Sequence, residues 1–196
     1  MNIIIPMAGM GKRLRPHTLT TPKPLIPIAG KPIVWWLVHD IVGVIDEKID
    51  NIGFVVSRSV DESIQNELLD IAEKLGAYGH LFYQEEALGT AHAIYCAKNI
   101  LKGPVIVAFA DTLFKANFKL DTKQDGIVWV HKVKDPSAFG VVKLNESNEI
   151  IDFIDEFKTL TGIPGNNGFG GFENQITVDK AQYLVNPVIP DHCAGK

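Results

Sequence analysis

The sequence lacks the features that would place it among secreted or membrane proteins. Its 196 residues include only 2 cysteines, and Cys96 and Cys193 lie far apart without a Cys-x-x-Cys or Cys/His metal-binding spacing. This usage favours a reducing compartment with two unliganded thiols. No apolar run approaches the roughly 20 residues that span a bilayer, and no basic leader with a long apolar core opens the sequence. We therefore expect a cytoplasmic protein that does not act at a membrane.

The sequence also lacks a large excess of positive or negative charge. The sequence has 19 lysines and arginines against 23 aspartates and glutamates, for a formal net charge of −4 at pH 7. No run of Lys or Arg forms the basic stripe that a nucleic-acid partner requires. The 46% hydrophobic and 21% charged residues are typical of a folded domain. A chain of this length buries roughly 70% of its unfolded surface, so any metal ion would serve chemistry rather than folding.

Strand-like and helix-like segments alternate in the first half of the chain. Apolar runs predict strands at 3–7, 52–56, 80–83 and 104–110, and helical periodicity predicts helices at 33–45, 60–75 and 90–101. This alternation predicts an α/β fold, an open Rossmann-like sheet with helices on both faces and ligand sites outside the carboxyl ends of its strands. Three further runs at 127–131, 140–144 and 150–154 predict hairpins appended to the sheet, which make it mixed.

A glycine-rich loop, Gly9-Met10-Gly11, directly follows the first predicted strand. Glycine has no Cβ, so backbone N–H groups can approach a phosphate there. The loop is not a dinucleotide-binding fingerprint, because Leu14 stands where the third glycine belongs. It is not a Walker A loop either, because Pro6 takes the place of the glycine before Lys12. The many prolines that follow exclude a long helix, and an extended loop of this length is usually functional or disordered.

Four cations follow in this loop, namely Lys12, Arg13, Arg15 and Lys23. Beside exposed backbone donors, on a rigid proline scaffold, they would form an anion cradle sized for a triphosphate rather than for a duplex. The alternative is a basic, solvated loop. The position of the cluster at the carboxyl end of a strand favours the cradle.

The segment from Pro6 to Pro32 resembles the signature of sugar-phosphate nucleotidyltransferases, the group that includes glucose-1-phosphate thymidylyl- and uridylyltransferases. The match lies in Gly-x-Gly-x-Arg, Pro-x-Thr and Pro-Lys-Pro, in that order. The resemblance continues through Gln84, Leu88-Gly89-Thr90-Ala91-His92-Ala93, Ala110-Asp111 and Phe139-Gly140-Val141-Val142. It covers residues 1 to about 155 and implies the N-terminal part of a catalytic domain with the nucleotide-diphospho-sugar transferase fold.

The resemblance implies that the phosphate of a sugar 1-phosphate attacks the α-phosphorus of a nucleoside triphosphate. UTP or dTTP is favoured, the reaction depends on Mg²⁺, and it yields an NDP-sugar and pyrophosphate. The attacking phosphate is already an anion at neutral pH, so no catalytic base is required and the absence of a Ser-His-Asp or Cys-His set is expected. The step needs charge neutralisation and in-line positioning of two anions that repel one another.

The resemblance also implies roles for three catalytic residues. Arg13 would hold the departing pyrophosphate, and Lys23 would bridge the sugar phosphate and the α-phosphate. Asp111 would ligate Mg²⁺, a cation that prefers one or two carboxylates together with substrate oxygens. The alternatives are a solvated lysine between two prolines and an aspartate that caps the turn after a buried strand.

Further residues are assigned to the substrates by the same resemblance. Gln84 offers an acceptor and a donor, which suits the imide edge of uracil or thymine; alternatively it faces water at a strand end. Thr90 would equally suit the N-cap of the next helix. The histidines, including His92, stand singly, and we expect them to be structural or solvated. The nucleotide-binding set is Ala8, Gly9, Gly11, Lys12, Gln84, Gly89 and Thr90, and the sugar-binding set is Gly140 and Asp155.

The resemblance weakens after residue 155. The family continues with Phe-x-Glu-Lys-Pro, whereas this sequence has Phe153-Ile154-Asp155-Glu156-Phe157-Lys158 and no convincing second metal-binding acid. We therefore predict a nucleotidyltransferase-like domain at 1–158 and an atypical segment at 159–196. That segment suggests a truncated or frameshifted product, or else a shortened variant. The alternative function is a catalytically incomplete nucleotide- or sugar-nucleotide-binding domain, and the sequence leaves the oligomeric state open, a homo-oligomer included.

Overall fold

The computed structural model describes residues 1–9, 21–110, 113–115, 118–124, 126–130, 140–147, 149–154, 175–178 and 183–185. The chain divides into two units. The first contains Met1–Ile127 and Tyr183–Lys196, and the second contains Val128–Gln182. The boundary predicted at 158 lies outside the described residues and stays a prediction. Each unit is described by itself.

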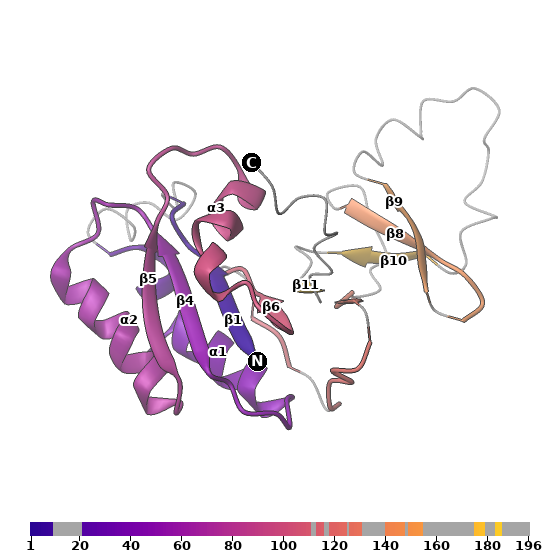
Figure 1. Ribbon diagram of the computed structural model, residues 1–196, viewed down its shortest axis with the longest axis horizontal. Helices are drawn as coiled ribbons and strands as arrows, with labels where there is room; N and C mark the ends of the chain where they lie inside the picture. The colour runs from indigo at the N-terminus through magenta and orange to yellow at the C-terminus, as the bar shows by residue number, and fades with distance from the viewer. Residues whose placement is uncertain are drawn as a thin grey trace. The chain divides into compact units, whose positions relative to one another are not determined.

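A six-stranded sheet with the strand order β5-β4-β1-β6-β11-β7 forms the centre of the first unit. Figure 1 shows β5, β4, β1 and β6 side by side. Strands β5, β4, β1 and β6 are parallel to one another, whereas β11 runs antiparallel to β6. The mixed α/β sheet predicted from the sequence is thereby confirmed. The strands are β1 (Asn2–Pro6), β4 (Asn51–Val56), β5 (Tyr78–Tyr83), β6 (Val105–Val107), β7 (Gly126–Val128) and β11 (Tyr183–Val185).

Helices and short turns connect these strands. The helices are α1 (Ile33–Gly43), α2 (Glu62–Lys74) and α3 (Thr90–Cys96), the 3₁₀ turns are η2 (Lys23–Leu25) and η3 (Lys98–Ile100), and a short antiparallel pair joins β2 (Pro27–Ile28) and β3 (Lys31–Pro32). The single helix predicted at 90–101 is thus α3 followed by η3. The chain tightens into the 3₁₀ form after Cys96, where the Ile100 N–H donates to the Ala97 carbonyl at 3.0 Å, a common ending for a short helix.

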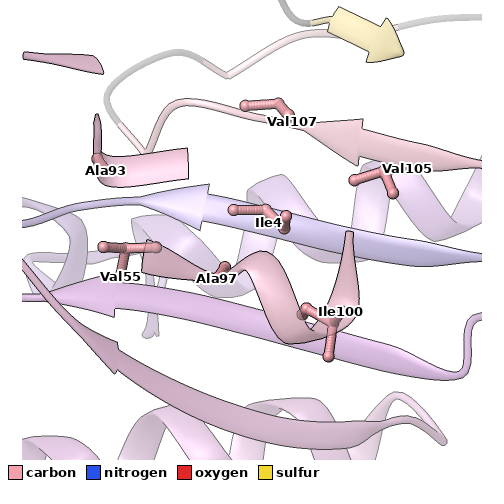
Figure 2. Close-up of a cluster of buried hydrophobic side chains, with 7 residues drawn as sticks. All are labelled: Ile4, Val55, Ala93, Ala97, Ile100, Val105 and Val107. Carbon is pink, nitrogen blue, oxygen red and sulfur yellow. The ribbon is translucent and has the colours of Figure 1, made fainter. Parts of the chain in front are cut away.

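The strand order places helices on both faces of the sheet. The connections through α1 and α2 lead from β1 to β4 to β5, and the connection through α3 returns past β1 to β6. Because such crossovers are right-handed, α3 lies on the face opposite to α1 and α2. Figure 2 shows the α3 face, where α3 and η3 pack on β1, β4 and β6 through a buried cluster of Ile4, Val55, Ala93, Ala97, Ile100, Val105 and Val107.

Two glycines let the helices approach the sheet closely. A Cβ at Gly79 of β5 would lie 2.9 Å from Leu69 Cδ2 and 3.1 Å from Ala72 Cβ, both on α2. On the other face, a Cβ at Gly53 of β4 would lie 2.7 Å from Ile100 Cδ1. Side chains at these two positions would therefore push α2 or η3 away from the strands that carry the loops described below.

Three strands form the second unit, in the order β10-β8-β9. They are β8 (Gly140–Leu144), β9 (Ile150–Ile154) and β10 (Gln175–Val178), all antiparallel. The predicted hairpin at 140–154 therefore forms, but the expectation that it extends the main sheet is wrong. It builds a separate sheet, because β10 pairs with the second edge of β8.

The segment 159–196 contributes a strand to each sheet, since β10 pairs with β8 and β11 pairs with β6. The sequence signal was weak because the strands are only four and three residues long. Their hydrogen-bonding partners also lie far away in the sequence. Sequence periodicity therefore did not separate a strand from a helix in this segment.

The described residues bear on the expected absence of a membrane span and on one of the two thiols. Within them, no helix has both the length and the apolar character needed to cross a membrane. Cys96 is a partly buried thiol that forms no disulfide within the described residues. Cys193 lies outside the described residues.

A hydrogen-bonded chain of side chains joins three strands at the amino edge of the sheet. Asn2, which is 8% exposed, donates its amide hydrogens to the carbonyls of Ile100 at 2.9 Å and Lys102 at 3.2 Å. It accepts one from Asn51 Nδ2 at 2.8 Å, and Asn51 Oδ1 lies 2.8 Å from His80 Nε2. An amide oxygen only accepts, so His80 Nε2 is the donor. The network ties β1, β4 and β5 to the end of η3.

We predict that Asn2→Ala lowers the free energy of unfolding by about 1–3 kcal/mol, the cost of leaving buried polar groups without partners. Urea denaturation of the purified chain measures this. Asn66→Ala, an exposed position on α2, is the control and should change stability little. Equal losses in both variants would contradict the role assigned to the network.

Candidate functional site

The parallel strands of the first unit end together at one edge of the sheet. The Met7 N–H donates to the Val55 carbonyl at 2.8 Å, the Gln84 N–H to the Val56 carbonyl at 2.9 Å, and the Ala108 N–H to the Ile4 carbonyl at 3.0 Å. The strands that follow β1 in the sequence, β4 and β5, lie on one side of it, and β6 lies on the other side. The order of the strands therefore reverses at β1, which is the topological switch point. In open α/β sheets, ligands bind outside the carboxyl ends of the strands at such a switch point.

The loop after β1 begins at this switch point. Ala8 is half-buried and Gly9 is exposed. Among the described residues, a Cβ built on Gly9 would meet nothing within 4 Å, which is compatible with the predicted approach of a phosphate. Gly11, Lys12 and Arg13 lie outside the described residues, and their assigned roles stay predictions.

Lys23 is held on a turn that is anchored in the core. It opens η2, between Pro22 and the buried Pro24. The next residue, Leu25, is 6% exposed, and the Ile33 N–H at the start of α1 donates to the Ile26 carbonyl at 3.2 Å. The backbone that carries Lys23 is therefore fixed, which suits a cation that must position an anion.

The connection from β5 to α3 brings several of the predicted nucleotide-binding residues together. Gln84 Nε2 donates to the Gly89 carbonyl at 3.0 Å and lies 3.2 Å from His92 Nδ1. The same carbonyl accepts from the Ala93 N–H at 3.2 Å. Thr90 follows Gly89 directly. The contact of Gln84 with His92 was not predicted from the sequence; His92 lies in the first turn of α3, three residues after Gly89.

Gly89, rather than Thr90, is the N-cap of α3. Its φ of 96° and ψ of −178° are outside the range that other residues readily adopt, and no side chain caps the helix. The alternative role of Thr90 as N-cap is therefore wrong. The chain needs a glycine at 89 because only this backbone conformation turns it from the loop into the helix.

An ion pair borders this cluster. Arg58, after β4, donates from Nε to Glu85 Oε1 at 2.7 Å, and its guanidinium carbon lies 5.1 Å from the ring centroid of Tyr83. Both charged side chains are more than half exposed, and exposed pairs contribute little to stability. This cation at the carboxyl edge was not predicted from the sequence.

The remaining predicted residues are not brought into this cluster by the described structure. Asp111 and Asp155 lie outside the described residues, although Ala110, directly before Asp111, is buried. Gly140 begins β8 in the second unit. Across the described parts of the chain, no group of three or more His, Cys, Asp or Glu side chains could hold a metal ion.

The sheet order and the switch point at β1 define a doubly wound α/β protein, a class of fold that binds ligands at the carboxyl edge of its sheet. Comparison with known proteins gives the family. The chain belongs to the nucleotidyl transferase family, whose model matches residues 2–160. The resemblance found in the loop sequence is confirmed.

Curated relatives carry related names. The bifunctional protein GlmU of Methanococcus vannielii is 33% identical over 156 residues, 80% of this chain and 35% of that protein. The mannose-1-phosphate guanylyltransferase catalytic subunit beta of Drosophila melanogaster is 36% identical over 202 residues, 98% of this chain and 50% of that protein. The chain thus spans about a third to a half of the length of these relatives.

Solved structures share the fold. A UDP-glucose pyrophosphorylase complexed with UDP-glucose matches with a TM-score of 0.65 at 22% identity, covering 95% of this chain and 76% of that one. A putative glucose-1-phosphate thymidylyltransferase from Bacillus anthracis, complexed with a sucrose, matches with a TM-score of 0.72 at 21% identity, covering 95% and 71%. The predicted nucleotide-diphospho-sugar transferase fold is confirmed.

We predict that Gly89→Ala destabilises the chain by about 1–3 kcal/mol, the typical cost of holding a non-glycine residue in a rarely populated backbone region. Gly9→Ala is the matched control, because a Cβ at either glycine meets nothing within 4 Å and only Gly89 has a positive φ. Thermal unfolding of the two variants provides the measurement. A Gly89→Ala chain that melts with the parent would mean that the turn relaxes without cost.

Proposed function

We propose that this chain transfers a nucleotidyl group from a nucleoside triphosphate to a sugar 1-phosphate, forming an NDP-sugar and pyrophosphate. The observation that carries the proposal is the match to the nucleotidyl transferase family over residues 2–160, a range that contains every residue assigned to the site. The alignment of four strand ends at one edge supports it, since this edge is where such folds bind nucleotides.

UTP and dTTP are the favoured nucleotides, on the resemblance of the loop sequence. The names of the matched proteins support a wider panel, because they include a UDP-glucose pyrophosphorylase, a putative glucose-1-phosphate thymidylyltransferase and a mannose-1-phosphate guanylyltransferase. GTP therefore belongs with UTP and dTTP among the nucleotides to test. Glucose 1-phosphate and mannose 1-phosphate are the first acceptors to test.

The triphosphate would be bound by the loop after β1. The backbone at Ala8 and Gly9, continued by Gly11, would supply N–H donors, and Lys12 and Arg13 would supply positive charge. Arg13 would hold the pyrophosphate as it departs and so stabilise charge that develops in the transition state. Loss of one such contact typically costs about 3 kcal/mol of transition-state stabilisation.

The acceptor would be positioned by Lys23, with Gly140 and Asp155 at the sugar. A sugar phosphate and a triphosphate repel each other, so the attacking oxygen reaches the α-phosphorus only when a fixed cation lies between them. The anchored η2 turn provides such a position for Lys23. Because the nucleophile is already ionised, no side chain has to remove a proton.

Mg²⁺ is the cofactor that the family resemblance implies, with Asp111 as its protein ligand. A single carboxylate fits this ion, which retains several waters and takes the rest of its ligands from substrate phosphates. When bound, the ion would supply charge neutralisation at the phosphates. The protein's own contribution is the carboxylate placed after the buried end of β6.

The test is pyrophosphate release from the full chain with Mg²⁺, a triphosphate panel and a set of sugar 1-phosphates. We predict that the parent releases pyrophosphate only when both substrates are present and that Asp111→Asn reduces the rate at least 100-fold, as loss of a major electrostatic contact does. If no pair of substrates reacts while a nucleotide still raises the melting temperature, the chain is the catalytically incomplete binding domain instead.

A second prediction separates the two substrates. Lys23→Ala should lower kcat/KM for the sugar 1-phosphate by about 100-fold, because the cation acts where the two anions meet, while the Kd of the free nucleotide changes less than threefold, or about 0.7 kcal/mol. Lys31→Ala is the control, since Lys31 is exposed and lies over the Trp35 ring. A Lys23→Ala variant that reacts like the parent would exclude a bridging role.

A further inference from the structure

The orientation of the Gln84 side-chain amide is fixed by the group it faces. The Gly89 carbonyl lies 3.0 Å from one end of that amide. A carbonyl oxygen only accepts hydrogen bonds, so the end of Gln84 that faces it must be the nitrogen. The reverse orientation would place two acceptor oxygens against each other.

The second hydrogen of the same nitrogen is directed to His92. Gln84 Nε2 lies 3.2 Å from His92 Nδ1, and a nitrogen that donates to Nδ1 requires an imidazole whose proton is on Nε2. His92 is partly buried on α3. Both hydrogens of the Gln84 amide are therefore engaged by the protein, one by Gly89 and one by His92.

This arrangement leaves the Gln84 carbonyl oxygen, Oε1, as the atom available to a ligand. Within the described residues, no protein group donates a hydrogen bond to it. Gln84 extends from the carboxyl end of β5, where its N–H is bonded to the Val56 carbonyl. The site thus presents an acceptor, and only an acceptor, from this side chain.

Hydrogen bonds to the Gly89 carbonyl connect the Gln84 amide to the first turn of α3. The Gly89 carbonyl accepts from both Gln84 Nε2 and the Ala93 N–H, and Ala93 is 4% exposed in the core beneath α3. Gly89 is the N-cap of α3, with a φ of 96° that glycine adopts without steric cost. One helical turn therefore holds both partners of the amide, and His92 is the partner supplied by a side chain.

We propose that His92 is a positioning residue, which holds the Gln84 amide with its oxygen outward and thereby makes the site select nucleotides whose base carries a ring N–H. This inference rests on the proposed function, in which Gln84 contacts the base. Uracil and thymine offer N3–H, and guanine offers N1–H. Cytosine and adenine have an unprotonated acceptor nitrogen at the corresponding ring position. A site that presents a fixed hydrogen-bonding group rejects an analogue that cannot pair with it.

The test measures the Kd values of UTP, dTTP, GTP, CTP and ATP by calorimetry for the full chain. The parent should bind at least one of the three ring N–H nucleotides more tightly than both CTP and ATP. His92→Leu should reduce this preference about tenfold, which corresponds to about 1.4 kcal/mol, the size of one hydrogen bond that no longer orients the amide. His92→Asn should keep the preference, because Oδ1 of asparagine can accept at the position of Nδ1.

Two variants of Gln84 test the acceptor itself. Gln84→Leu removes the acceptor and should abolish the preference, whereas Gln84→Glu keeps oxygen acceptors but loses the two hydrogens that Gly89 and His92 engage, so it should reduce the preference at least as much as His92→Leu does. Tyr95→Leu, an exposed position on α3, is the control for general effects on that helix and should leave the preference unchanged. Melting temperatures of all variants show whether each remains folded.

The outcomes separate this inference from the proposed function. If the parent binds none of the five nucleotides, the proposed function fails, and this inference fails with it. If the parent binds nucleotides but His92→Leu keeps the same preference as a folded chain, the positioning role alone is overturned. Nitrogen chemical shifts of the His92 ring give a check that needs no ligand: a proton on Nε2 supports the inference, and a proton held on Nδ1 overturns it.

Discussion

The reversal of chain direction at β1 is the constraint on which the site depends. β1 lies between β4 and β6, and the chain leaves it toward β4 and comes back to it at β6. The connections at the carboxyl ends of these strands therefore lead in opposite directions across the sheet, which is the place where doubly wound folds bind their ligands. Every residue assigned to the triphosphate follows that strand, and Asp111 follows the strand on its other side.

The two edges of the sheet have different roles. At the amino edge, hydrogen bonds join Asn2 to Asn51, Asn51 to His80, and Asn2 to carbonyls of the chain after α3. The polar groups of these side chains thus contribute to the fold. At the carboxyl edge, a Cβ added at Gly9 or Gly89 would meet no atom of the described residues within 4 Å. Between these two edges, α2 packs closely on β5 at Gly79 and η3 packs closely on β4 at Gly53. These contacts stabilise the sheet without involving the residues at the carboxyl edge.

The sequence predicted the strands whose apolar pattern can be recognised within a few neighbouring residues. Apolar runs predicted β1 and β4 because strands buried on both faces need apolar side chains along their length, and Ile3, Ile4 and Ile5 are indeed fully buried. The grouping of Gln84 with Gly89 was predicted by resemblance to the family. By contrast, β10 and β11 were not predicted, because strands of four and three residues are stabilised by partners far away in the sequence.

The role of His92 was missed for a related reason. A single histidine in an apolar helix carries no pattern, and its significance arises only from the amide that it faces. The capping role considered for Thr90 failed because Gly89 reaches the required backbone conformation without a side chain. Sequence reasoning thus identified which residues lie in the β5–α3 connection, while the direction in which each presents its hydrogen-bonding groups needed coordinates.

The order of the strands also sets how far apart the parts of a bound nucleotide would lie. Neighbouring strands are about 4.8 Å apart, and β5 is separated from β1 by β4, so the Gln84 end of β5 lies roughly 10 Å from the loop after β1, two strand spacings away. A base held at β5 and phosphates held at β1 would therefore stretch the nucleotide across the end of β4. In that arrangement the α-phosphorus, which lies between the base and the departing pyrophosphate, would come to the switch point. Selection of the base by Gln84 and neutralisation of the phosphates are thus assigned to different strands, which allows the base preference to change without altering the groups that act on phosphorus.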